Sequence, residues 1–366
     1  MTFPNFKEKR EIVDSSLIVK KMEKNTMKVA LTFDDGPNNT ESRTNDGKRN
    51  CDVTNHLLDA LKQTGVVATF FVVGNNVKKC GDCISKMIKE GHLVGNHTRS
   101  HWSGNGNGMY SHTSHDASAI LSDIEGCNKD VYKFALEGEL KREYTPRFFR
   151  CPEGKYGKEI EEACKKTGMV NVGKYDLFAK EPYHVGWSSD DNSWKSEITA
   201  EQIQNLVTGT LRDAGDKDLV ILSHDHYANH SQAWTAEFIR KIKNDYNIQF
   251  VRIDELVGKR DNLEAGEYLL PGQAIESLDG KYRLVFQRDT NLVLYLEGGA
   301  SANAKWATGQ IGGVGEKATL TDQGEIEISN KSGLLKKFSF PHEGGEWKAG
   351  SRLVVDNNGK FKYQTL

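Results

Sequence analysis

The chain lacks the features that would place it in several specialised classes of protein. Its 366 residues carry 49 Lys and Arg against 51 Asp and Glu, a formal net charge of −2. No excess of one sign therefore favours nucleic acid or an anionic membrane as a partner. No apolar run approaches the roughly 20 residues that span a bilayer, and hydrophobic residues make up an ordinary 37%. A membrane-embedded chain and a disordered chain are both excluded.

The first 24 residues also lack the apolar core of a secretory leader. Two interpretations remain: an intracellular protein, or a mature or recombinant form of a secreted or cell-wall protein. Cysteine is absent after position 164, and the six cysteines are Cys51, Cys80, Cys83, Cys127, Cys151 and Cys164. An even number favours a disulfide network, with reduced core thiols as the alternative. The Cys80–Cys83 spacing also fits a redox pair or a zinc knuckle, although no second Cys pair follows at the distance of a zinc ribbon.

The chain divides into two regions of different composition. This agrees with its length, because 366 residues at about 150 residues per domain predict two domains. Residues 28–260 alternate short β-rich runs with helical patterns, after an N-terminal extension of residues 1–27. The expected strands are 29–33, 66–73, 92–95, 147–149, 169–172, 185–187, 219–222 and 250–253, and the clearest helices are 53–61, 83–90, 199–213 and 232–244. Repeated strand–helix units require a parallel sheet. Seven or eight units predict an α/β domain built as a closed or nearly closed (β/α) barrel, with reactive residues at the carboxyl ends of its strands.

Residues 265–366 have a different texture, with frequent Gly and Asn and short alternating strands. Residues 284–295 form one clear β segment. Weaker copies follow at Asp322 and Asn357, which are 33 and then 35 residues after Asp289 and Asp322. A near-constant period indicates a small all-β domain built from three repeats.

Two clusters of metal-ligand residues follow predicted strands. Asp34 and Asp35 lead into Gly36-Pro37, and adjacent carboxylates in one pocket favour a shared cation. The alternative is a simple turn, for which Asp-Asp-Gly-Pro is good chemistry. His97 and His101 are four residues apart, on one face of a helical turn. Two histidines with a carboxylate leave a position open for water, as in catalytic zinc sites, so the clusters together predict a metal site.

Three further segments follow predicted strands. They are Arg150-Cys151-Pro152-Glu153-Gly154, the stretch from Trp187 to Trp194, and Leu222-Ser223-His224. An arginine can keep a carboxylate ionised by bidentate hydrogen bonding, and a histidine can donate a proton near neutral pH. His112, His115, His226 and His230 are expected to be loop or surface residues, and 103–118 reads as an inserted loop.

Taken in order, these motifs resemble carbohydrate esterase family 4, the polysaccharide deacetylases, over roughly residues 28–258. The Leu-Ser-His-Asp wording at 222–225 is most similar to the chitin deacetylases. The resemblance implies a deformed (β/α) barrel and a divalent metal, usually Zn²⁺, with Co²⁺ as an alternative. It assigns Asp35, His97 and His101 to the metal, and Asp34 as the general base. Arg150 would orient Asp34, and His224 would be the general acid. Substrate contacts would come from Glu153, Trp187, Asp190, Trp194 and Leu222, with the Glu153 backbone N–H facing the oxyanion.

Two positions depart from the family pattern. Glu153 stands where the family usually has Tyr, which alters one wall of the substrate groove but keeps the backbone donor. Ser193 replaces the second Asp of the family's Asp-x-x-Asp-Trp motif, the usual partner of the acid histidine. Unless Asp190 or Asp191 substitutes, His224 would be a weaker acid. Cys151 within the third motif is also unusual, and a disulfide is the expected explanation.

The clear β segment contains a string that resembles the signature of bulb-type mannose-binding lectins, whose fold is a three-faced β-prism. Its residues are Gln287, Asp289, Asn291, Val293 and Tyr295, expected on one face of a strand. In the second repeat Leu320 replaces Gln and Gly324 replaces Asn, so at most one sugar site is expected. Even that copy could serve only the fold.

The sequence thus predicts a metal-dependent N-deacetylase of N-acetylglucosamine polymers such as chitin, joined to a lectin-like domain that binds glycans. A peptidoglycan deacetylase or an acetylxylan esterase is the alternative within the class. A catalytically inactive glycan-binding protein is the alternative outside it, favoured by Ser193 and Glu153.

Overall fold

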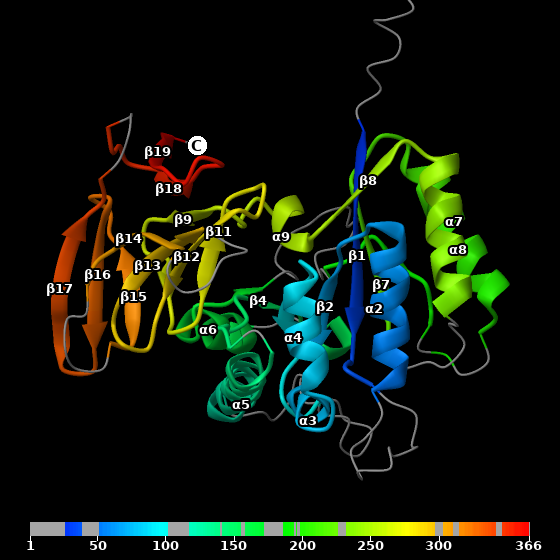
Figure 1. Cartoon of the computed structure of the whole chain (residues 1–366), viewed down its shortest axis with the longest axis horizontal. Coiled ribbons are helices and arrows are strands. Elements are labelled where there is room, and N and C mark those ends of the chain that lie inside the picture. Colours follow the sequence, from blue (N-terminus) through cyan, green and yellow to red (C-terminus); the bar gives the residue numbers. More distant parts are fainter. Residues whose placement is uncertain are drawn as a thin grey trace, which may run out of the picture.

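The computed structural model describes residues 26–38, 51–101, 117–139, 141–154, 158–171, 186–193, 195, 198–225, 232–296, 303–309, 315–341 and 346–365. An α/β domain runs up to α9 (Ile253–Leu256), and strands alone follow in residues 262–365, the β module (Figure 1). None of the helices in these ranges combines the length and apolar character needed to cross a membrane.

The α/β domain alternates strands and helices, as the sequence predicts. The strands are β1 (Met27–Asp34), β2 (Thr69–Val72), β3 (Leu93–Asn96), β4 (Phe148–Phe149), β5 (Val170–Asn171), β6 (Ser189–Asp190), β7 (Leu219–His224) and β8 (Ile248–Val251). The helices are α2 (Asp52–Thr64), α3 (Gly74–Val77), α4 (Asp82–Lys89), α5 (Ala117–Glu137), α6 (Lys158–Lys166), α7 (Ala200–Ala214), α8 (Gln232–Asp245) and α9, with a 3₁₀ turn at Pro152–Gly154.

Local sequence signals set several of these boundaries. Gly65 ends α2 in the left-handed conformation, with φ of 63°, and its N–H bonds back to the Leu61 and Lys62 carbonyls. Thr199 opens α7 with a reciprocal capping box to Gln202. The expected strand at 185–187 is wrong over its described residues, since strand pairing there begins at Ser189. Helix α5, which supports the site described below, was not predicted.

All the strand pairs of the α/β domain are parallel, which confirms the expected sheet type. The order is β5-β4-β3-β2-β1-β7-β6, and β8 pairs with the first residues of β1. Within the described residues this sheet is open, with β5 and β6 at its edges, so the expected barrel closure is not seen there. The edge strands are two residues long, too short to extend a hydrogen-bonded ladder around a barrel. Residues 172–185 between them lie outside the described ranges.

The cysteines follow both of the alternatives left open by the sequence. Cys51, before α2, forms a disulfide with Cys80, before α4, while Cys83, Cys127, Cys151 and Cys164 are buried and form no disulfide. The expected disulfide network, the Cys80–Cys83 pair and a disulfide at Cys151 are therefore wrong. Cys151 instead packs with Cys164 in an apolar cluster. Burial raises the pKa of Cys83 and of Cys164 to about 12, so these thiols stay neutral and unreactive.

Reduction should therefore act on one cross-link. Because the Cys51–Cys80 bond closes a loop with a sequence separation of 29, we expect a reductant to lower the free energy of unfolding by about 2–4 kcal/mol. Urea denaturation with and without dithiothreitol measures this. The variant Cys51→Ala should match the reduced protein and be insensitive to reductant. Equal midpoints for oxidised and reduced protein would contradict the expectation.

The β module consists of three antiparallel sheets around one apolar core. Its strands are β9 (Asn262–Glu264), β10 (Tyr268–Leu269), β11 (Ala274–Glu276), β12 (Tyr282–Phe286), β13 (Leu292–Leu296), β14 (Ala304–Ala307), β15 (Lys317–Leu320), β16 (Glu325–Asn330), β17 (Gly333–Ser339), β18 (Ser351–Val355) and β19 (Phe361–Thr365). The sheets are β11-β12-β13-β14, β10-β15-β16-β17 and β19-β18-β9. Leu284, Leu320 and Leu353, one from each sheet, meet in the core. The all-β character is confirmed.

Each sequence repeat forms a hairpin of a different sheet: β12–β13, β15–β16 or β18–β19. The predicted alignment of the second and third copies with the first copy is off by one residue. The N–H of Gln287, Thr321 and Asp356 bonds to the carbonyl four residues on in each turn, so these three positions are equivalent. The backbone conformation of the turn explains this equivalence. Thr290, Gly324 and Gly359 occupy the same turn position, with φ of 68°, 78° and 70°, where glycine is the favoured residue. Thr321 and Glu325, rather than Leu320 and Gly324, thus replace Gln287 and Asn291.

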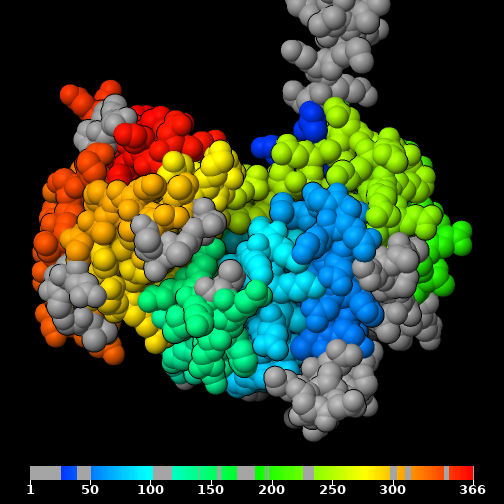
Figure 2. All heavy atoms as spheres, in the orientation of Figure 1, coloured from blue at the N-terminus to red at the C-terminus, as the bar shows by residue number. Residues whose placement is uncertain are grey.

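The β module packs against the amino end of the parallel sheet. Arg147, just before β4, donates to the carbonyls of Lys259 and Asn262 at 2.6 and 3.2 Å. Gly168, just before β5, donates to the Tyr268 hydroxyl at 3.1 Å. The yellow surface of the module adjoins the green surface of the α/β domain (Figure 2). Among the described residues, the bonds of Arg147 and Gly168 lie at the amino ends of β4 and β5, opposite the carboxyl ends of the strands.

One buried carboxylate dominates this junction. Glu276 of β11, with an 18% exposed side chain, lies among four arginines from both parts of the chain. The distances to its oxygens are 3.0 Å from Arg252, 3.7 Å from Arg142, 3.8 Å from Arg260 and 3.9 Å from Arg283. Burial alone would raise the pKa of Glu276, but these charges outweigh it and lower the pKa to about 2. The carboxylate is therefore ionised at all ordinary pH values.

Candidate active site and metal centre

The predicted site residues gather at the carboxyl ends of neighbouring strands. Asp34 ends β1 and Asp35 follows it, His97 follows β3, and His224 ends β7. Parallel pairing places these ends at one edge, and Asp34 is directly opposite His224 in the β1–β7 register. The topology thus brings together residues nearly 200 positions apart.

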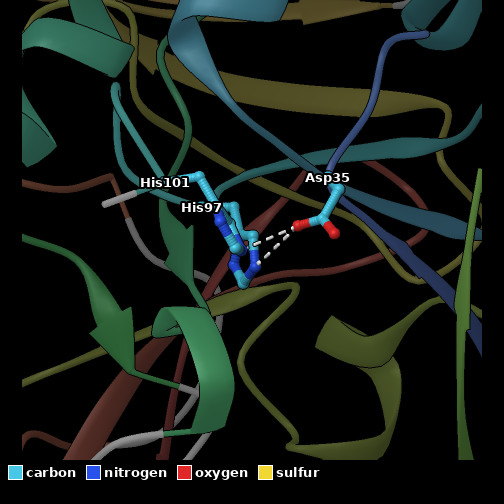
Figure 3. Close-up of side chains that lie close together, drawn as sticks. All are labelled: Asp35, His97 and His101. Atoms are coloured by element: carbon cyan, nitrogen blue, oxygen red, sulfur yellow. Dashed lines mark ion pairs between the residues drawn. The ribbon is translucent and has the colours of Figure 1, made fainter. Parts of the chain in front are cut away.

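Asp35, His97 and His101 converge on one point (Figure 3). Asp35 Oδ1 lies 2.9 Å from His101 Nε2 and 3.4 Å from His97 Nε2. The three donor atoms lie within 4.8 Å of one another. Two imidazole nitrogens and a carboxylate oxygen are the donor set of a catalytic zinc centre, with a coordination position left for water.

The tautomer of His97 fits metal binding. Its Nδ1 lies 2.7 Å from the Arg150 carbonyl oxygen, which can only accept, so Nδ1 carries the proton. The lone pair of Nε2 is then directed toward Asp35 and His101. A backbone carbonyl behind a ligand histidine is the usual orienting contact in metal sites. The residues present therefore fit a divalent metal.

The Asp35 carboxylate and the His101 imidazole shift each other's pKa. Burial would raise the pKa of Asp35, but the neighbouring His101 and His97 outweigh it and hold the pKa well below its usual range. Burial would lower the pKa of His101, but the bond to Asp35 raises it above its ordinary value. A carboxylate that stays ionised beside two imidazoles has the charge that a divalent cation requires.

Asp34 is held from one side and faces the metal site from the other. Its Oδ1 accepts from an Arg150 guanidinium nitrogen at 2.8 Å, and its Oδ2 lies 3.7 Å from His97 Nε2. Arg150, whose side chain is 1% exposed, also donates to Thr32 Oγ1 and the Gly186 carbonyl. Its guanidinium carbon lies 4.3 Å from the centroid of the Phe71 ring. A base orientated by an arginine beside a metal-ligand cluster is suited to taking a proton from water.

Ser193 occupies the place of the missing acidic partner of His224. Its Oγ accepts from the His224 backbone N–H at 2.8 Å and lies 3.3 Å from His224 Nδ1. Asp190 and Asp191 are also close, because one oxygen of each and a His224 ring nitrogen lie within 4.8 Å of one another. The surroundings of the histidine therefore remain acidic despite the serine.

Left-handed backbone conformations concentrate at the site. Among the described non-glycine residues with positive φ are Asp35 (72°), Thr98 (65°), His101 (41°), Glu153 (56°) and Asn192 (58°). Each of these five lies in one of the motifs. Such conformations cost on the order of 1–3 kcal/mol and persist only where the surroundings enforce them. Strain at these positions is a functional signal independent of the side-chain chemistry.

The expected substrate-binding residues are only partly accounted for. Trp187 is half-buried, and its ring centroid lies 5.6 Å from the Arg150 guanidinium. Leu222 is 3% exposed within β7 and is paired with Thr32 of the neighbouring strand β1. Trp194 lies outside the described residues, as do His112, His115, His226 and His230.

Helix α5 is the largest part of the site that sequence reasoning missed. Its Asp123 carboxylate accepts from the backbone N–H groups of Arg99 and Ser100 at 3.1 and 3.2 Å. Asn96 donates to the Ile124 carbonyl and accepts from the Thr98 N–H. These bonds fix the loop between the two histidines. A polar residue that caps a distant loop leaves no local pattern in the sequence.

The lectin-like residues do not share one strand face, so that expectation is wrong. Gln287, Asp289 and Asn291 lie in the turn between β12 and β13, while Val293 is buried. The polar groups contact other residues of the module: Gln287 Nε2 donates to the Tyr295 hydroxyl at 3.1 Å, and Asn291 Oδ1 accepts from Thr308 at 3.1 Å. A tight turn needs such internal bonds, which compete with a sugar for the same atoms.

Comparison with known proteins finds similarity within the α/β domain. Residues 21–172 match the family model described as polysaccharide deacetylase, and this part of the chain is therefore similar to that family. The chain is 31% identical over 213 residues to a peptidoglycan-N-acetylglucosamine deacetylase of Bacillus cereus, covering 57% of this chain and 59% of that protein.

Two named deacetylases are similar to the chain over a comparable length. A chitooligosaccharide deacetylase of Rhizobium leguminosarum is 27% identical over 208 residues, covering 54% of this chain and 71% of that one. The solved structure of the peptidoglycan deacetylase PdaC from Bacillus subtilis matches with a TM-score of 0.46 and 26% identity, over 65% of this chain and 93% of that chain. The chain spans less than two thirds of the Bacillus cereus relative.

Proposed function

We propose that the protein is a metal-dependent hydrolase that removes N-acetyl groups from N-acetylglucosamine units of chitin or chitooligosaccharides. The observation that carries this proposal is the position of Asp34, held by Arg150 at 2.8 Å on one side and facing the Asp35–His97–His101 cluster on the other. This is the arrangement of a general base next to a metal-activated water.

The protein groups have separable tasks in this reaction. Asp35, His97 and His101 would hold the divalent metal, Zn²⁺ or Co²⁺, which when bound lowers the pKa of water and polarises the acetamide carbonyl. Asp34 takes a proton from the water that attacks the carbonyl carbon. Arg150 keeps the Asp34 carboxylate orientated through its 2.8 Å hydrogen bond. The backbone N–H of Glu153 serves the developing oxyanion.

His224 completes the reaction on the opposite side of the substrate. It donates a proton to the sugar nitrogen as the carbon–nitrogen bond breaks, which leaves acetate and a free amine. Ser193 Oγ, 3.3 Å from Nδ1, and the neighbouring Asp190 and Asp191 orient the ring. These contacts favour an active enzyme over an inactive glycan-binding protein, the alternative that Ser193 raised.

Peptidoglycan is the second candidate substrate. It is favoured by the name of the Bacillus cereus relative, which acts on N-acetylglucosamine in peptidoglycan. Acetylated xylan remains the third, with ester rather than amide cleavage by the same groups. A secreted or cell-wall location fits all three polymers, and the Cys51–Cys80 disulfide fits an oxidising compartment.

The β module is proposed as a lectin-like β-prism domain that attaches the enzyme to glycans, mannose-containing or chitinous, through the turn at Gln287, Asp289 and Asn291. Three antiparallel sheets with one repeat hairpin each support this proposal. Tethering raises the local concentration of substrate without new chemistry.

Acetate release tests the enzymatic proposal directly. Chitooligosaccharides, peptidoglycan and acetylated xylan are compared before chelation, after chelation and after addition of Zn²⁺ or Co²⁺. We expect chelation to abolish release and metal to restore it, with chitooligosaccharides the fastest. His101→Ala should lose both metal and turnover, whereas His56→Ala, an exposed histidine of α2, should lose neither. Glycan binding without turnover under any metal would favour the inactive lectin instead.

A further inference from the structure

A buried aspartate directly after His224 has no part in the chemistry described so far. Asp225 is 3% exposed and lies against the loop that follows β1. Its Oδ1 accepts from Asn38 Nδ2 at 2.6 Å, and its Oδ2 accepts from Thr54 Oγ1 at 2.9 Å. Its backbone N–H bonds to the Asp34 carbonyl at 3.4 Å. One side chain thus joins the end of β7 to the loop after β1 and to the start of α2.

The same contacts reach the metal ligand. Asn38 Nδ2 bonds both to the Asp225 carboxylate and to the Asp35 carbonyl, the latter at 3.2 Å. The Asn38 backbone N–H donates to Thr54 Oγ1 at 2.7 Å, and Thr54 N–H returns a bond to the Asn38 carbonyl. The Asp35 carbonyl is thus held by Asn38, together with a 2.7 Å bond from Asn76 Nδ2. Asn38 is in turn held by Asp225 and Thr54.

Asp35 needs such support because its φ is 72°, a strained value for a residue with a side chain. Gly36, the next residue, approaches Asp225 so closely that a Cβ built on it would lie 2.0 Å from Asp225 Oδ2. No side chain larger than hydrogen fits there. Gly36 is thus required by its contact with Asp225 as well as by the turn.

We propose that Asp225 is a positioning residue that holds the metal ligand Asp35 and the acid His224 in fixed relation through Asn38 and Thr54. This rests on the proposed function, because it concerns the same metal and the same acid. Among the described residues, the hydrogen bonds of Asp225 go to Asn38, Thr54 and the Asp34 carbonyl rather than to the three metal-ligand atoms. Loss of a residue that hydrogen-bonds to a metal ligand typically lowers metal affinity or activity by about 10–100-fold.

Metal affinity of the full chain, measured by calorimetric titration of the metal-free protein with Zn²⁺, is the primary test. Asp225→Asn places an amide NH₂ where a carboxylate accepted two bonds, so one of the two donors loses its acceptor. We expect the Zn²⁺ dissociation constant to rise about 10–100-fold and the visible spectrum of the Co²⁺ form to change. Acetate release should fall through kcat, with KM nearly unchanged.

Thr54→Val is the second variant, in case Asp225→Asn fails to fold. It removes one bond to Asp225 and the bond from Asn38 N–H while keeping the shape of the side chain. The matched control is Thr64→Val at the other end of α2, whose buried hydroxyl bonds only to the Ala60 and Leu61 carbonyls among the described residues. We expect Thr54→Val to weaken Zn²⁺ binding and Thr64→Val to leave it unchanged.

The outcomes separate this inference from the proposed function. Folded Thr54→Val that binds Zn²⁺ as tightly as the wild type, with an unchanged Co²⁺ spectrum, overturns the positioning role. Wild-type protein that binds Zn²⁺ but releases no acetate from any polymer overturns the deacetylase proposal and leaves the affinity comparison valid. Wild-type protein that binds no metal overturns both.

Discussion

Asp34→Asn is expected to lower acetate release by about 10²–10⁴-fold, the usual contribution of a general base. The amide keeps the size of the carboxylate but cannot take a proton from water. Asp34 supplies none of the three convergent metal-ligand atoms, so Zn²⁺ should still bind. Steady-state kinetics and calorimetric Zn²⁺ titration of the same preparation make the measurement.

Asp218→Asn is the matched control for this variant. Asp218 lies before β7 at the amino end of the sheet, and its carboxylate accepts from the Lys28 N–H at 2.7 Å. Asp218→Asn makes the same change from carboxylate to amide, but beside the first residues of β1, so full activity is expected. If Asp34→Asn kept turnover within about threefold of the wild type, Asp34 would not be the base.

Glu276→Gln is expected to destabilise the whole chain by about 3–5 kcal/mol, since removal of one partner from a buried ion cluster leaves the others uncompensated. Four arginines would then share a site without their central charge. Urea denaturation at neutral pH measures the loss. Asp245→Asn, which breaks the exposed Lys241–Asp245 pair on α8, should leave the midpoint unchanged. An unchanged midpoint for Glu276→Gln would show that the cluster adds nothing to stability.

The pH dependence of the same variant has a defined sign. The pKa of Glu276 is about 2 in the folded chain against an ordinary value of 4.5. A carboxyl with a lowered folded pKa stabilises the fold above its unfolded pKa, and this contribution fades as pH falls through the folded pKa. The stability difference between wild type and Glu276→Gln should therefore be constant above about pH 5 and shrink between pH 4.5 and 2. A difference that stays constant down to pH 2 would contradict the lowered pKa.

Much of the site could be predicted because its residues lie in short motifs at strand ends. Asp34, His97 and His224 each follow a recognisable β run, and parallel pairing then brings them to one edge. The roles of Asp123 and Asp225 were missed for a physical reason. They act through hydrogen bonds to groups distant in the sequence, and nothing in the local sequence indicates those partners. Cys51–Cys80 was missed because spacing alone cannot choose among 15 pairings.

The alignment of the three β repeats could also be predicted only in part from the sequence. The period revealed three copies, but matching Asp289 to Asp322 shifted their register by one residue. The equivalent positions are set by the backbone, through the positive φ of Thr290, Gly324 and Gly359, and a threonine in that set conceals the relation. The sequence indicates the number of strands but not the two-residue length of β4, β5 and β6, so the open sheet seen within the described residues was not predicted.

Contacts at two places fix the β module against the α/β domain. The guanidinium carbon of Arg288, in the turn beside the lectin-like residues, lies 3.8 Å from the centroid of the Tyr132 ring of α5, and the Arg288 backbone N–H donates to Glu143. Glu276 and its arginines form the second contact. Under the proposed function, a glycan bound at that turn would have to extend from there to the carboxyl ends of the strands to be deacetylated. Among oligomers of one sugar, the rate of acetate release is then expected to rise with chain length.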